Sequence, residues 1–457
     1  MSFLLKNRLL RIAAFASVVV AAVAAPATAA PGDLDRGFGG DGKVTTDFGG
    51  DVSDTARAIA VDSQGRVVVG GTTRAEVPLD PVYSIALARY LPTGELDPSF
   101  GDGGLVIAPE DEYSSVNSIV IDPQDRILIG GGVFEDDSLP GGIVARFNED
   151  GSIDTSFGYP SFPGFAFEQG GQASPAVGSV AGIRMRAGSI FSAGSIYHED
   201  LDAYPTPSEI AVSKLDGDGD LDPSYGEDGV ARPKQAGRFN RAMAMDLASG
   251  GRVVVAGTTG HLGSYYDVSP VIARLLPDGS IDRGFGDGGR VSLFEGSKHA
   301  VGVGAIAVER SDKTVVVACT GMLRPKRPGG GRVRVVRLRA DGARDRNFSG
   351  NGAKTIDFGP NFGCGEAALV AKGSLYVGGY VQSRPRKTES EDYVLAKLDR
   401  HGRMVPGFGR RGIVKTDFGG GEDQVHDLAI APGGRILAAG YGYEAASTDM
   451  AVAAYRR

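Results

Sequence analysis

The chain has 457 residues, a formal net charge of −8, 70 glycines and no tryptophan. This acidic balance excludes a protein that binds nucleic acid through a broad basic surface, because no excess of Lys and Arg is available to neutralise phosphates. Glycine is about twice as common as in an average protein. It clusters with Pro, Asp and Ser between short apolar runs, which favours many short strands joined by tight turns.

The N-terminal segment has the three-part layout of a secretory signal peptide. Basic residues precede an apolar run at 12–25, which is followed by the small residues Ala27-Thr28-Ala29. The run is shorter than the roughly 20 residues that a membrane-spanning helix needs. We therefore predict a signal peptide at 1–30 and a single domain at 31–457, with no membrane span. The mature protein is expected to be secreted, either extracellular or associated with the cell envelope.

One stretch, Leu96-Asp97-Pro98-Ser99-Phe100-Gly101-Asp102-Gly103-Gly104, recurs along the chain in varied form. Three further apolar runs surround it in the first unit, at 58–62, 66–71 and 85–90, and a fourth follows at 105–107. These runs and the Gly-containing turns between them predict four antiparallel strands per unit. The aromatic residue of each copy marks seven units, spaced 57 to 68 residues apart: Phe38, Phe100, Phe157, Tyr225, Phe285, Phe348 and Phe408.

Four short strands cannot bury both faces of their sheet alone, so neighbouring units must stack face to face. A ring removes the exposed ends of such a stack, and seven lies within the common range of blade numbers. We predict an all-β fold, a seven-bladed β-propeller with four antiparallel strands per blade; an open β-solenoid is the alternative. The last unit stops at its third strand, 450–455, whereas a short strand at 43–47 precedes the first full unit. We expect this N-terminal strand to complete the C-terminal blade.

The combination of 96–101, 58–62 with 66–71, and 85–90 resembles the delta-60 repeat family, a bacterial β-propeller-like repeat. The resemblance covers nearly all of the mature chain, and it implies the architecture and an extracellular or surface setting. It implies no catalytic residue, so a function must be argued from the site. Val405 departs from the pattern, because the other copies have an acidic residue there.

A basic residue near the end of the third strand recurs in most units, and an aspartate follows it in the next turn. Arg89 with Asp97 is the first such pair, and Arg337 with Asp345 is the last. An active site occurs once in a chain, whereas these charges occur in nearly every unit. We interpret them as structural ion pairs or turn-stabilising contacts.

Polar residues that occur only once gather on one predicted rim, where the second strand connects to the third and the fourth to the next first strand. Six of them, at the starts of innermost strands or just before, are candidate ligand-binding residues at the channel mouth: Arg57, Asn117, Arg241, His299, Glu366 and His426. Histidine beside carboxylates can hold a divalent cation or perform acid–base chemistry. The alternative interpretation is that these residues are polar only because loops at a rim are exposed to water.

The chain has no nucleophile elbow, zinc-protease helix or phosphate-binding loop in a supporting context. The first function hypothesis is therefore a binding or structural module without catalysis. The alternative is a lyase or a metal-dependent hydrolase that uses the residues at the channel mouth. We expect no cofactor beyond, at most, a divalent cation.

Three further features concern ligands and covalent links. Asp216, Asp218 and Asp220 imitate the spacing of a calcium loop, but Leu221 stands where such a loop needs glycine, so a tight turn is the simpler interpretation. The two cysteines, Cys319 and Cys364, form either a disulfide between neighbouring repeats or two buried thiols. Basic, Pro-rich segments at 324–329 and 384–387 suit an anionic polymer such as a polysaccharide. The predicted partner is thus a protein or a polysaccharide, and the chain is expected to be a monomer.

Overall fold

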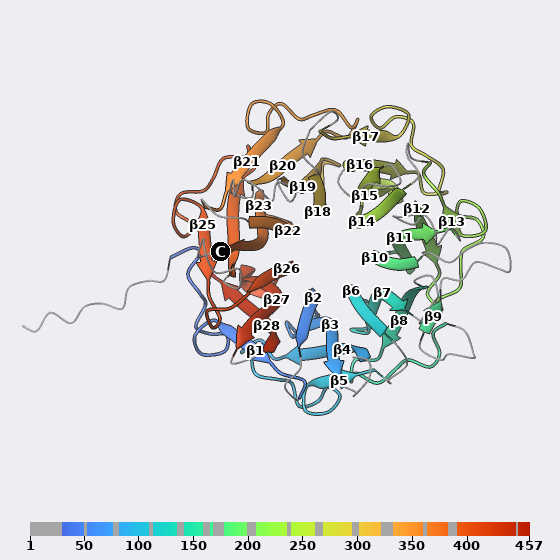
Figure 1. Ribbon diagram of the computed structural model, residues 1–457. Coiled ribbons are helices and arrows are strands. Elements are labelled where there is room, and N and C mark those ends of the chain that lie inside the picture. The colour runs from blue at the N-terminus through green and yellow to red at the C-terminus, as the bar shows by residue number, and fades with distance from the viewer. Residues whose placement is uncertain are drawn as a thin grey trace, which may run out of the picture.

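The computed structural model describes residues 30–49, 53–75, 82–108, 113–134, 141–158, 165–167, 178–198, 207–234, 239–260, 268–294, 301–320, 332–359, 363–382, 391–444 and 447–457. These residues form seven four-stranded antiparallel sheets, arranged as blades around a central axis (Figure 1). The predicted seven-bladed β-propeller is confirmed. The closed ring, with its short connections between blades, excludes the open solenoid.

The strands of the first four blades are β2 (Asp54–Val61), β3 (Val67–Ala75), β4 (Val82–Tyr90), β5 (Leu105–Ile107), β6 (Tyr113–Ile121), β7 (Ile127–Phe134), β8 (Gly141–Phe147), β9 (Phe165–Phe167), β10 (Gly178–Arg186), β11 (Ser189–Tyr197), β12 (Ser208–Leu215), β13 (Val230–Ala231), β14 (Phe239–Leu247), β15 (Val253–Gly260), β16 (Val268–Leu275) and β17 (Arg290–Ser292). Each blade uses four consecutive strands, so blade 1 is β2 to β5 and blade 4 is β14 to β17.

The remaining strands are β18 (Val301–Val308), β19 (Thr314–Thr320), β20 (Arg332–Leu338), β21 (Ala353–Asp357), β22 (Gly363–Ala371), β23 (Ser374–Gln382), β24 (Glu391–Asp399), β25 (Ile413–Thr416), β26 (Gln424–Ile430), β27 (Ile436–Glu444), β28 (Ser447–Tyr455) and β1 (Lys43–Thr46). Blade 5 is β18 to β21, blade 6 is β22 to β25, and blade 7 combines β26 to β28 with β1. The described residues contain two 3-10 turns, η1 (Ser249–Gly251) and η2 (Pro432–Gly434), and no helix among them is long and apolar enough to cross a membrane.

The N-terminal strand closes the ring by completing blade 7. β1 pairs antiparallel with β28, with Lys43 opposite Ala453 and Thr46 opposite Met450. Thr46 Oγ1 also shares a 2.6 Å hydrogen bond with the Tyr90 hydroxyl of blade 1, so this strand contacts both sides of the seam. The predicted closure is confirmed, and blade 7 contains both ends of the propeller.

The hydrophobic core lies between blades, not within them. One cluster joins Ala58 and Leu87 of blade 1 to Ile119, Ile129 and Phe147 of blade 2. Each middle strand is apolar on both faces because a neighbouring blade covers each face. The repeated aromatic residues are at most 1% exposed, and burying a side chain of that size contributes about 2–3 kcal/mol.

The turn between the third and fourth strands carries an ion pair in five blades. Arg89 Nε donates to Asp97 Oδ2 at 2.8 Å, and the Arg89 guanidinium lies 4.6 Å from the ring centroid of Phe100. The other pairs are Arg146–Asp154 (2.7 Å), Lys214–Asp222 (2.6 Å), Arg274–Asp282 (2.7 Å) and Arg337–Asp345 (2.9 Å). Repetition of one geometry confirms that these charges are structural. In blade 6, where Val405 replaces the acid, Lys397 instead lies 5.4 Å from the ring centroid of Phe408.

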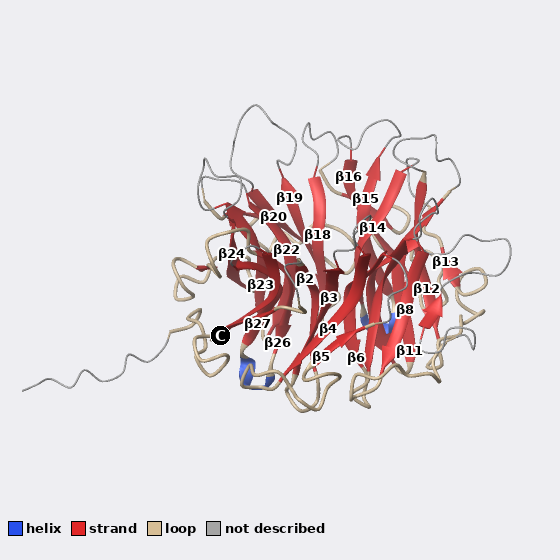
Figure 2. Cartoon of the chain, turned by 60° about the horizontal axis from the view of Figure 1, so that its bottom comes forward, coloured by secondary structure: helices blue, strands red, loops and turns tan. Residues whose placement is uncertain are grey.

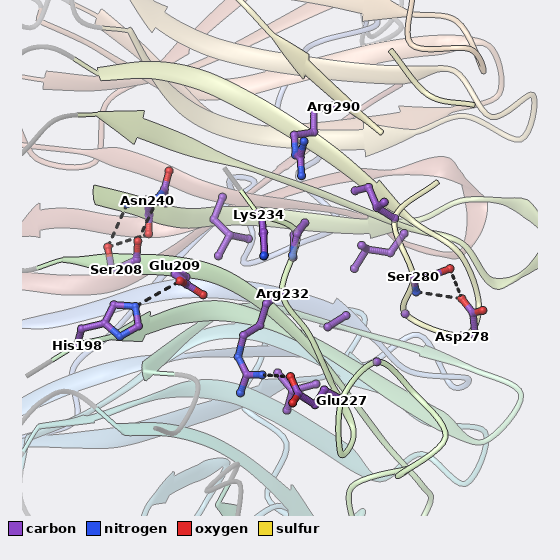
Figure 3. Close-up of a pocket in the computed structure, with 18 of the residues that line it drawn as sticks. His198, Ser208, Glu209, Glu227, Arg232, Lys234, Asn240, Asp278, Ser280 and Arg290 are labelled. Atoms are coloured by element: carbon purple, nitrogen blue, oxygen red, sulfur yellow. Dashed lines mark hydrogen bonds and ion pairs between the residues drawn. The ribbon is translucent and has the colours of Figure 1, made fainter. Parts of the chain in front are cut away.

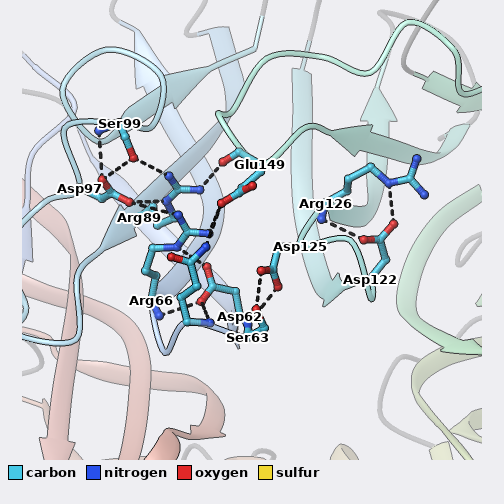
Figure 4. Close-up of polar contacts among 11 residues, drawn as sticks. Asp62, Ser63, Arg66, Arg89, Asp97, Ser99, Asp122, Asp125, Arg126 and Glu149 are labelled. Atoms are coloured by element: carbon cyan, nitrogen blue, oxygen red, sulfur yellow. Dashed lines mark hydrogen bonds and ion pairs between the residues drawn. The ribbon is translucent and has the colours of Figure 1, made fainter.

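Polar contacts join neighbouring blades at the end where these turns lie (Figure 4). Arg66 Nε donates to Asp62 Oδ2 of its own blade at 2.5 Å, while Arg66 Nη2 donates to Glu149 Oε1 of blade 2 at 2.7 Å. The amide and hydroxyl of Ser63 both donate to Asp125, at 3.0 and 2.5 Å. At this end of the propeller, polar side chains therefore stabilise the contact between neighbouring blades.

A disulfide links blades 5 and 6 near the channel. Cys319 lies on β19 and Cys364 on β22, and the two sulfurs are bonded. The sequence left open whether these cysteines were bonded or free, and the structure decides for the bond. The link holds β22 in place next to the residues of the candidate site.

Candidate functional site

The innermost strand of every blade is irregular near its start. The pairing register shifts at Arg57 in β2, Asn117 in β6, Met243 in β14, Gly304 in β18, Glu366 in β22 and His426 in β26, and between Gly178 and Gly182 in β10. A β-bulge of this kind re-aims the side chain of the extra residue. Glycine on the second strand makes room for it: a Cβ on Gly71 or Gly440 would lie 1.8 Å from the carbonyl oxygen of Thr55 or Gln424.

The bulged residues all line one cavity of about 390 Å³ on the propeller axis, here called the channel cavity. Going round the ring, blades 6, 7, 1 and 2 contribute the polar side chains Glu366, His426, Arg57 and Asn117. At their bulged positions, blades 3, 4 and 5 contribute Ala181, Met243 and Gly304. Blades 3 and 4 also line the cavity with the polar residues Ser179, Ser195, Tyr197 and Arg241. Only the bulged positions are therefore divided, into polar residues in blades 6, 7, 1 and 2 and small or apolar residues in blades 3, 4 and 5.

A histidine and a carboxylate form a pair among the polar bulged residues. His426 Nδ1 lies 2.6 Å from Glu366 Oε2, and the His426 side chain is only 10% exposed. With Nδ1–H donating to the carboxylate, Nε2 presents a lone pair, and this buried atom has no partner among the residues that the structure describes. The Tyr441 ring lies beside it, 5.6 Å away between centroids. The pair can orient the imidazole for accepting a hydrogen bond or a proton.

More acidic groups surround this pair. Burial, together with the negative charges of Glu422 and Glu366 and against a hydrogen bond from Gln424, raises the pKa of Glu391 to about 7. Burial together with these carboxylates also raises the pKa of Tyr441 above its usual value, whereas Arg57 lowers it. The blade 6 and blade 7 side of the channel is thus acidic.

A second cavity, of about 570 Å³, adjoins the channel at blade 1 and is here called the arginine pocket. Its lining residues are Ser53, Thr55, Arg57, Thr72, Arg74, Tyr83, Ser114, Ser115, Asn117, Ser179 and Arg241. Three are arginines, most of the others carry hydroxyls, and none is acidic. Arg57, Asn117, Ser179 and Arg241 line both cavities.

The arginines of the arginine pocket are not neutralised by carboxylates. Arg57 and Arg241 form no ion pair with any described residue, and the buried Nε of Arg74 has no hydrogen-bond partner there. Thr55 and Arg57 of β2 and Ser53, which directly precedes that strand, all line this pocket. Asn117 Nδ2 donates to the Val180 carbonyl oxygen at 3.0 Å, which ties blade 2 to blade 3 below the pocket.

A third cavity, of about 1150 Å³, lies between blades 3 and 4 (Figure 3). Val230 and Ala231, the two residues of β13, are part of its lining. Several of its charges are already paired: His198 Nε2 lies 3.5 Å from Glu209 Oε1, and Arg232 Nη1 lies 3.3 Å from Glu227 Oε2. This lateral groove is therefore a weaker candidate than the axial site.

The structure brings together most of the residues predicted for the channel mouth. Arg57, Asn117, Arg241, Glu366 and His426 line the channel cavity, whereas His299 lies outside the described residues. One detail differs from expectation, because His426 lies within β26 and not before it. In blade 4 the bulged residue is Met243, two positions after Arg241. That any of these residues binds a ligand stays a prediction.

Sequence reasoning missed Arg74, Tyr83 and the hydroxyl residues of the arginine pocket. The alternation of Ser53, Thr55 and Arg57 was a usable signal for one wall of it. No sequence signal indicated that β6, β10 and β14 would also line it, because those strands belong to other blades and come near β2 only in the ring.

The candidate calcium loop at Asp216 to Asp220 is a turn. The Asp216 carboxylate accepts hydrogen bonds from the amides of Asp218 (2.9 Å) and Asp220 (3.1 Å), so it closes a turn between β12 and β13. The basic segments at 324–329 and 384–387 lie outside the described residues.

Comparison with known proteins places the chain among β-propellers. Residues 63–100, 124–157 and 249–285 match a family model described as "Domain of unknown function (DUF5122) beta-propeller". No curated protein matches the chain. The match names a β-propeller family, and the narrower resemblance to delta-60 repeats stays a prediction.

Several solved structures are similar to this chain at low sequence identity. One is the PL25 ulvan lyase bound to -[GlcA(1-4)Rha3S]-, with 13% identity and a TM-score of 0.46, covering 91% of this chain and 95% of that chain. Another is the β-propeller domain of the Trilobed protease from Pyrococcus furiosus, with 9% identity and a TM-score of 0.42, covering 88% and 94%. The chain is similar to these two proteins over most of its length and is tied to the activity of neither.

Proposed function

We propose that this protein is a binding module whose arginine pocket holds a small anionic, polyhydroxylated ligand, such as a carboxylated or sulfated sugar. The observation that carries the proposal is the composition of that pocket, which gathers Arg57, Arg74 and Arg241 with no carboxylate among the described residues that line it. The whole chain has a net charge of −8, so this pocket is a cationic exception on an acidic protein.

The chemistry of the lining matches such a ligand. A guanidinium donates two parallel N–H bonds to a carboxylate or sulfate, which gives orientation as well as attraction. Ser and Thr hydroxyls can donate to and accept from ring hydroxyls. Tyr83 is 37% exposed and offers an aromatic face for the apolar side of a sugar ring. The pocket volume lies within the usual range for small-molecule sites.

The pocket is also preorganised, because most of its residues lie on strands. Thr55 and Arg57 are on β2, Thr72 and Arg74 on β3, and Arg241 on β14. Side chains held by paired strands lose less freedom on binding than side chains on loops, which favours affinity. The ligand fits as a free sugar acid or as one unit of a polysaccharide, which agrees with the expected setting outside the cytoplasm.

The test is a calorimetric titration of the full chain with glucuronate, glucose 6-sulfate and neutral glucose. We expect the two anions to bind at least about tenfold more tightly than glucose, because a hydrogen bond to a charged group contributes more than about 1.4 kcal/mol, which corresponds to a factor of ten in affinity. The affinity for the anions should fall as salt is added, because salt screens the charges. Arg57→Gln and Arg74→Gln should each weaken glucuronate binding about tenfold or more. Arg283→Gln removes the same charge from an exposed turn at the other end and should change nothing.

The proposal fails if glucose binds as tightly as the two anions, or if Arg57→Gln and Arg283→Gln bind glucuronate equally. Far-ultraviolet circular dichroism of each variant excludes misfolding as the cause of a loss. Because Arg57 lines both cavities, Arg74→Gln assigns the effect to the arginine pocket itself.

A second candidate function is acid–base catalysis on the bound sugar, and the unpartnered Nε2 of His426 favours it. In a lyase reaction Nε2 would take the proton from the carbon next to the sugar carboxylate. The electron pair left behind forms a carbon–carbon double bond and expels the oxygen of the linked sugar, which takes the proton from the imidazolium and leaves as a hydroxyl group. Glu366 would hold the imidazole, and Arg57 would offset the charge on the carboxylate.

A polymer of glucuronate distinguishes the two functions in one experiment. A binding module forms a complex with the polymer and releases no unsaturated product, whereas a lyase releases one that absorbs in the ultraviolet. Turnover by the native chain, with none by His426→Asn, would assign catalysis. Binding without turnover by either chain supports the binding module.

A further inference from the structure

The repeated turns that follow the third strand of each blade lie at one end of the propeller, here called the turn end (Figure 2). They join neighbouring blades through the same backbone contact. The Gly101 amide of blade 1 donates to the Asp150 carbonyl oxygen of blade 2 at 2.8 Å, and the Ser349 amide of blade 5 donates to the His401 carbonyl oxygen of blade 6 at 2.8 Å. Positions in different blades can therefore be compared residue by residue.

Blades 1 to 4 carry exposed carboxylates on the turn end. In the corner before the fourth strand, the amides of Asp102, Glu227 and Asp287 each donate to the carbonyl oxygen three residues later at 2.8 Å. Six exposed acids of these blades are here called the acidic arc: Asp102, Asp150, Asp218, Glu227, Asp228 and Asp287. Negative charge therefore continues round four of the seven blades.

Blade 6 has positive charge at the same corner. The Arg410 amide donates to the Ile413 carbonyl oxygen at 2.8 Å, which is the contact that Asp102 makes in blade 1. The next residue is Arg411, at the position of Asp228 in blade 3. Arg411 has φ +56° and Asp228 has φ +52°. Arginine tolerates a left-handed backbone less well than glycine or aspartate, so the turn itself does not favour arginine at this position.

The turn before this corner and the corner of blade 5 add more positive charge. Arg400 stands where blade 2 has Glu149, because the carbonyl oxygen of each accepts a hydrogen bond from the third-strand arginine of the preceding blade. Arg344 and Arg346 flank the structural Asp345 of blade 5. The exposed arginines of blades 5 and 6 are here called the basic arc: Arg344, Arg346, Arg400, Arg410 and Arg411.

The basic arc is not neutralised by nearby carboxylates. None of its five arginines forms an ion pair with a residue that the structure describes, and Arg400 Nε lies 3.0 Å from His401 Nε2. The neighbouring Asp341 and Asp399 each pair with another arginine of their own turn, at 2.7 and 2.9 Å. Blade 6 also lacks the structural aspartate, because Val405 replaces it. Unpaired positive charge therefore faces water on one side of the turn end.

We propose that the basic arc binds a flexible anionic polysaccharide, with its carboxylate or sulfate groups on neighbouring arginines. A guanidinium donates two parallel N–H bonds to a carboxylate or sulfate. One polymer chain contacts several of these arginines at once, so contacts that are weak one by one reinforce each other. The site does not depend on the proposed sugar binding, because no residue of the basic arc lines the arginine pocket or the channel cavity.

A membrane surface and a nucleic acid fit the turn end less well. A flat anionic bilayer would face the acidic arc together with the basic arc, and repulsion from the first would offset attraction to the second. The large apolar side chains that the structure describes as exposed, Tyr83, Ile107, Met243 and Tyr443, all lie outside blades 5 and 6. None of them can insert into lipid or stack on bases at the basic arc. A flexible polysaccharide can follow the basic arc alone.

The experiment titrates the full chain with polygalacturonate and with dextran sulfate at low salt. We expect both polymers to bind, with an affinity that falls as NaCl is added, because salt screens exposed charges. A chain with both Arg410→Gln and Arg411→Gln should bind polygalacturonate about tenfold more weakly. The same chain should keep the native affinity for monomeric glucuronate, which separates the basic arc from the arginine pocket.

A matched pair of single variants tests the position of the charge. Arg346 and Arg283 both follow the structural aspartate of their turn, but Arg283 belongs to blade 4, beside the acidic arc. Arg346→Gln should weaken polygalacturonate binding about threefold, whereas Arg283→Gln should leave it unchanged. Repeating the titrations in an Arg74→Gln background removes any contribution of the arginine pocket. Far-ultraviolet circular dichroism shows whether each variant is folded.

Three results would overturn the proposal. They are the absence of polymer binding to the native chain at low salt, native affinity for polygalacturonate in the double variant, and equal losses in Arg346→Gln and Arg283→Gln. Vesicles of phosphatidylglycerol and phosphatidylcholine in equal parts, and single-stranded poly(dT), serve as competing partners. Binding of either one as tightly as polygalacturonate would overturn the choice of a polysaccharide.

Discussion

Glu391 shows how burial and neighbouring charge set the behaviour of one carboxyl group. It begins β24 close to Glu366 and Glu422, and burial comes first among the causes that raise its pKa to about 7. Unfolding exposes the group to water, where its pKa returns to 4.5. The folded state therefore binds this proton more tightly than the unfolded state, and the stability contributed by the protonated form is lost as pH rises from about 4.5 to 7.

Replacing Glu391 with Gln should remove this pH dependence. We expect the native chain to lose more stability than Glu391→Gln between pH 5 and pH 8, so that the variant is relatively more stable by about 1–2 kcal/mol at pH 8, after discounting for solvent screening. Urea unfolding at a series of pH values measures the difference. The exposed Glu95→Gln serves as control, and parallel pH profiles for all three chains would contradict the argument.

The turn aspartates act in the opposite direction. Hydrogen bonds and an ion pair with Lys214 and Ser224 lower the pKa of Asp222 to about 2. Burial opposes the same change at Asp97, yet bonds from Ser99 and Arg89 lower its pKa as well. These groups contribute stability above the unfolded pKa, and that stability is lost as pH falls toward 2. Low pH therefore destabilises the turns by protonating Asp222 and Asp97, whereas a pH above 7 deprotonates Glu391 beside the channel.

At the scale of elements, the turn between β4 and β5 shows why its glycines are placed as they are. Gly101 has φ +52° and its amide donates to the Asp150 carbonyl oxygen of the next blade at 2.8 Å. A Cβ there would lie 2.0 Å from the Leu105 carbonyl oxygen. Gly103 in the same turn has a similar φ of +61°, but a Cβ there meets nothing within 4 Å.

Alanine substitutions separate the two effects. Gly103→Ala should cost about 1 kcal/mol, since only a left-handed backbone is imposed on a residue with a Cβ. Gly101→Ala should cost about 3 kcal/mol or more, because the backbone must also move away from Leu105 and loosen the contact with blade 2. Urea denaturation of both variants checks the prediction, and equal losses would show that the turn adjusts freely.

The bulges are the elements that turn a structural repeat into a candidate site. Strand pairing fixes every blade alike, and the bulge then places one variable residue of each innermost strand in the channel cavity. Variation at those positions changes the lining without disturbing the blade. The fold thus leaves the bulged residue of each of the seven blades free to differ. In blades 6, 7, 1 and 2 that residue is polar: Glu366, His426, Arg57 and Asn117.

The whole molecule depends on the seam at which β1 completes blade 7. Without β1 the backbone groups of β28 that face it are unpaired, and an exposed strand edge invites association with other chains. The contact between blades 7 and 1 also loses the hydrogen bond of Thr46 with Tyr90. Ring closure is thus a property of distant chain segments acting together.

Deleting residues 31–49 should lower the melting temperature by on the order of 10 °C and promote oligomers, because an edge of a four-stranded sheet is lost. Differential scanning calorimetry and size-exclusion chromatography measure both effects. A synthetic peptide of residues 31–49 added in excess should restore much of the loss, whereas a peptide with Val44→Pro, which cannot pair fully with Val452, should not. An unchanged melting temperature would show that β1 does not close the ring.

Much of this architecture was determined by the sequence alone. Alternating apolar runs and glycine turns specify strands locally, and the seven copies of one turn count the blades. The position of the 43–47 segment before the first unit predicted the seam, and the repeated Arg89 and Asp97 pattern predicted a structural pair. These inferences succeed because they depend on periodicity within one repeat, where the residues concerned are neighbours in the chain or in one sheet.

Only the tertiary structure decided what the residues of different blades do together. Five of the six predicted channel-mouth residues share a cavity, but the arginine pocket is built from strands of four blades, and the bond between Cys319 and Cys364 had an open alternative. Burial, pKa and charge complementarity are set by distances across the ring, and a sequence specifies those distances only through the folded chain.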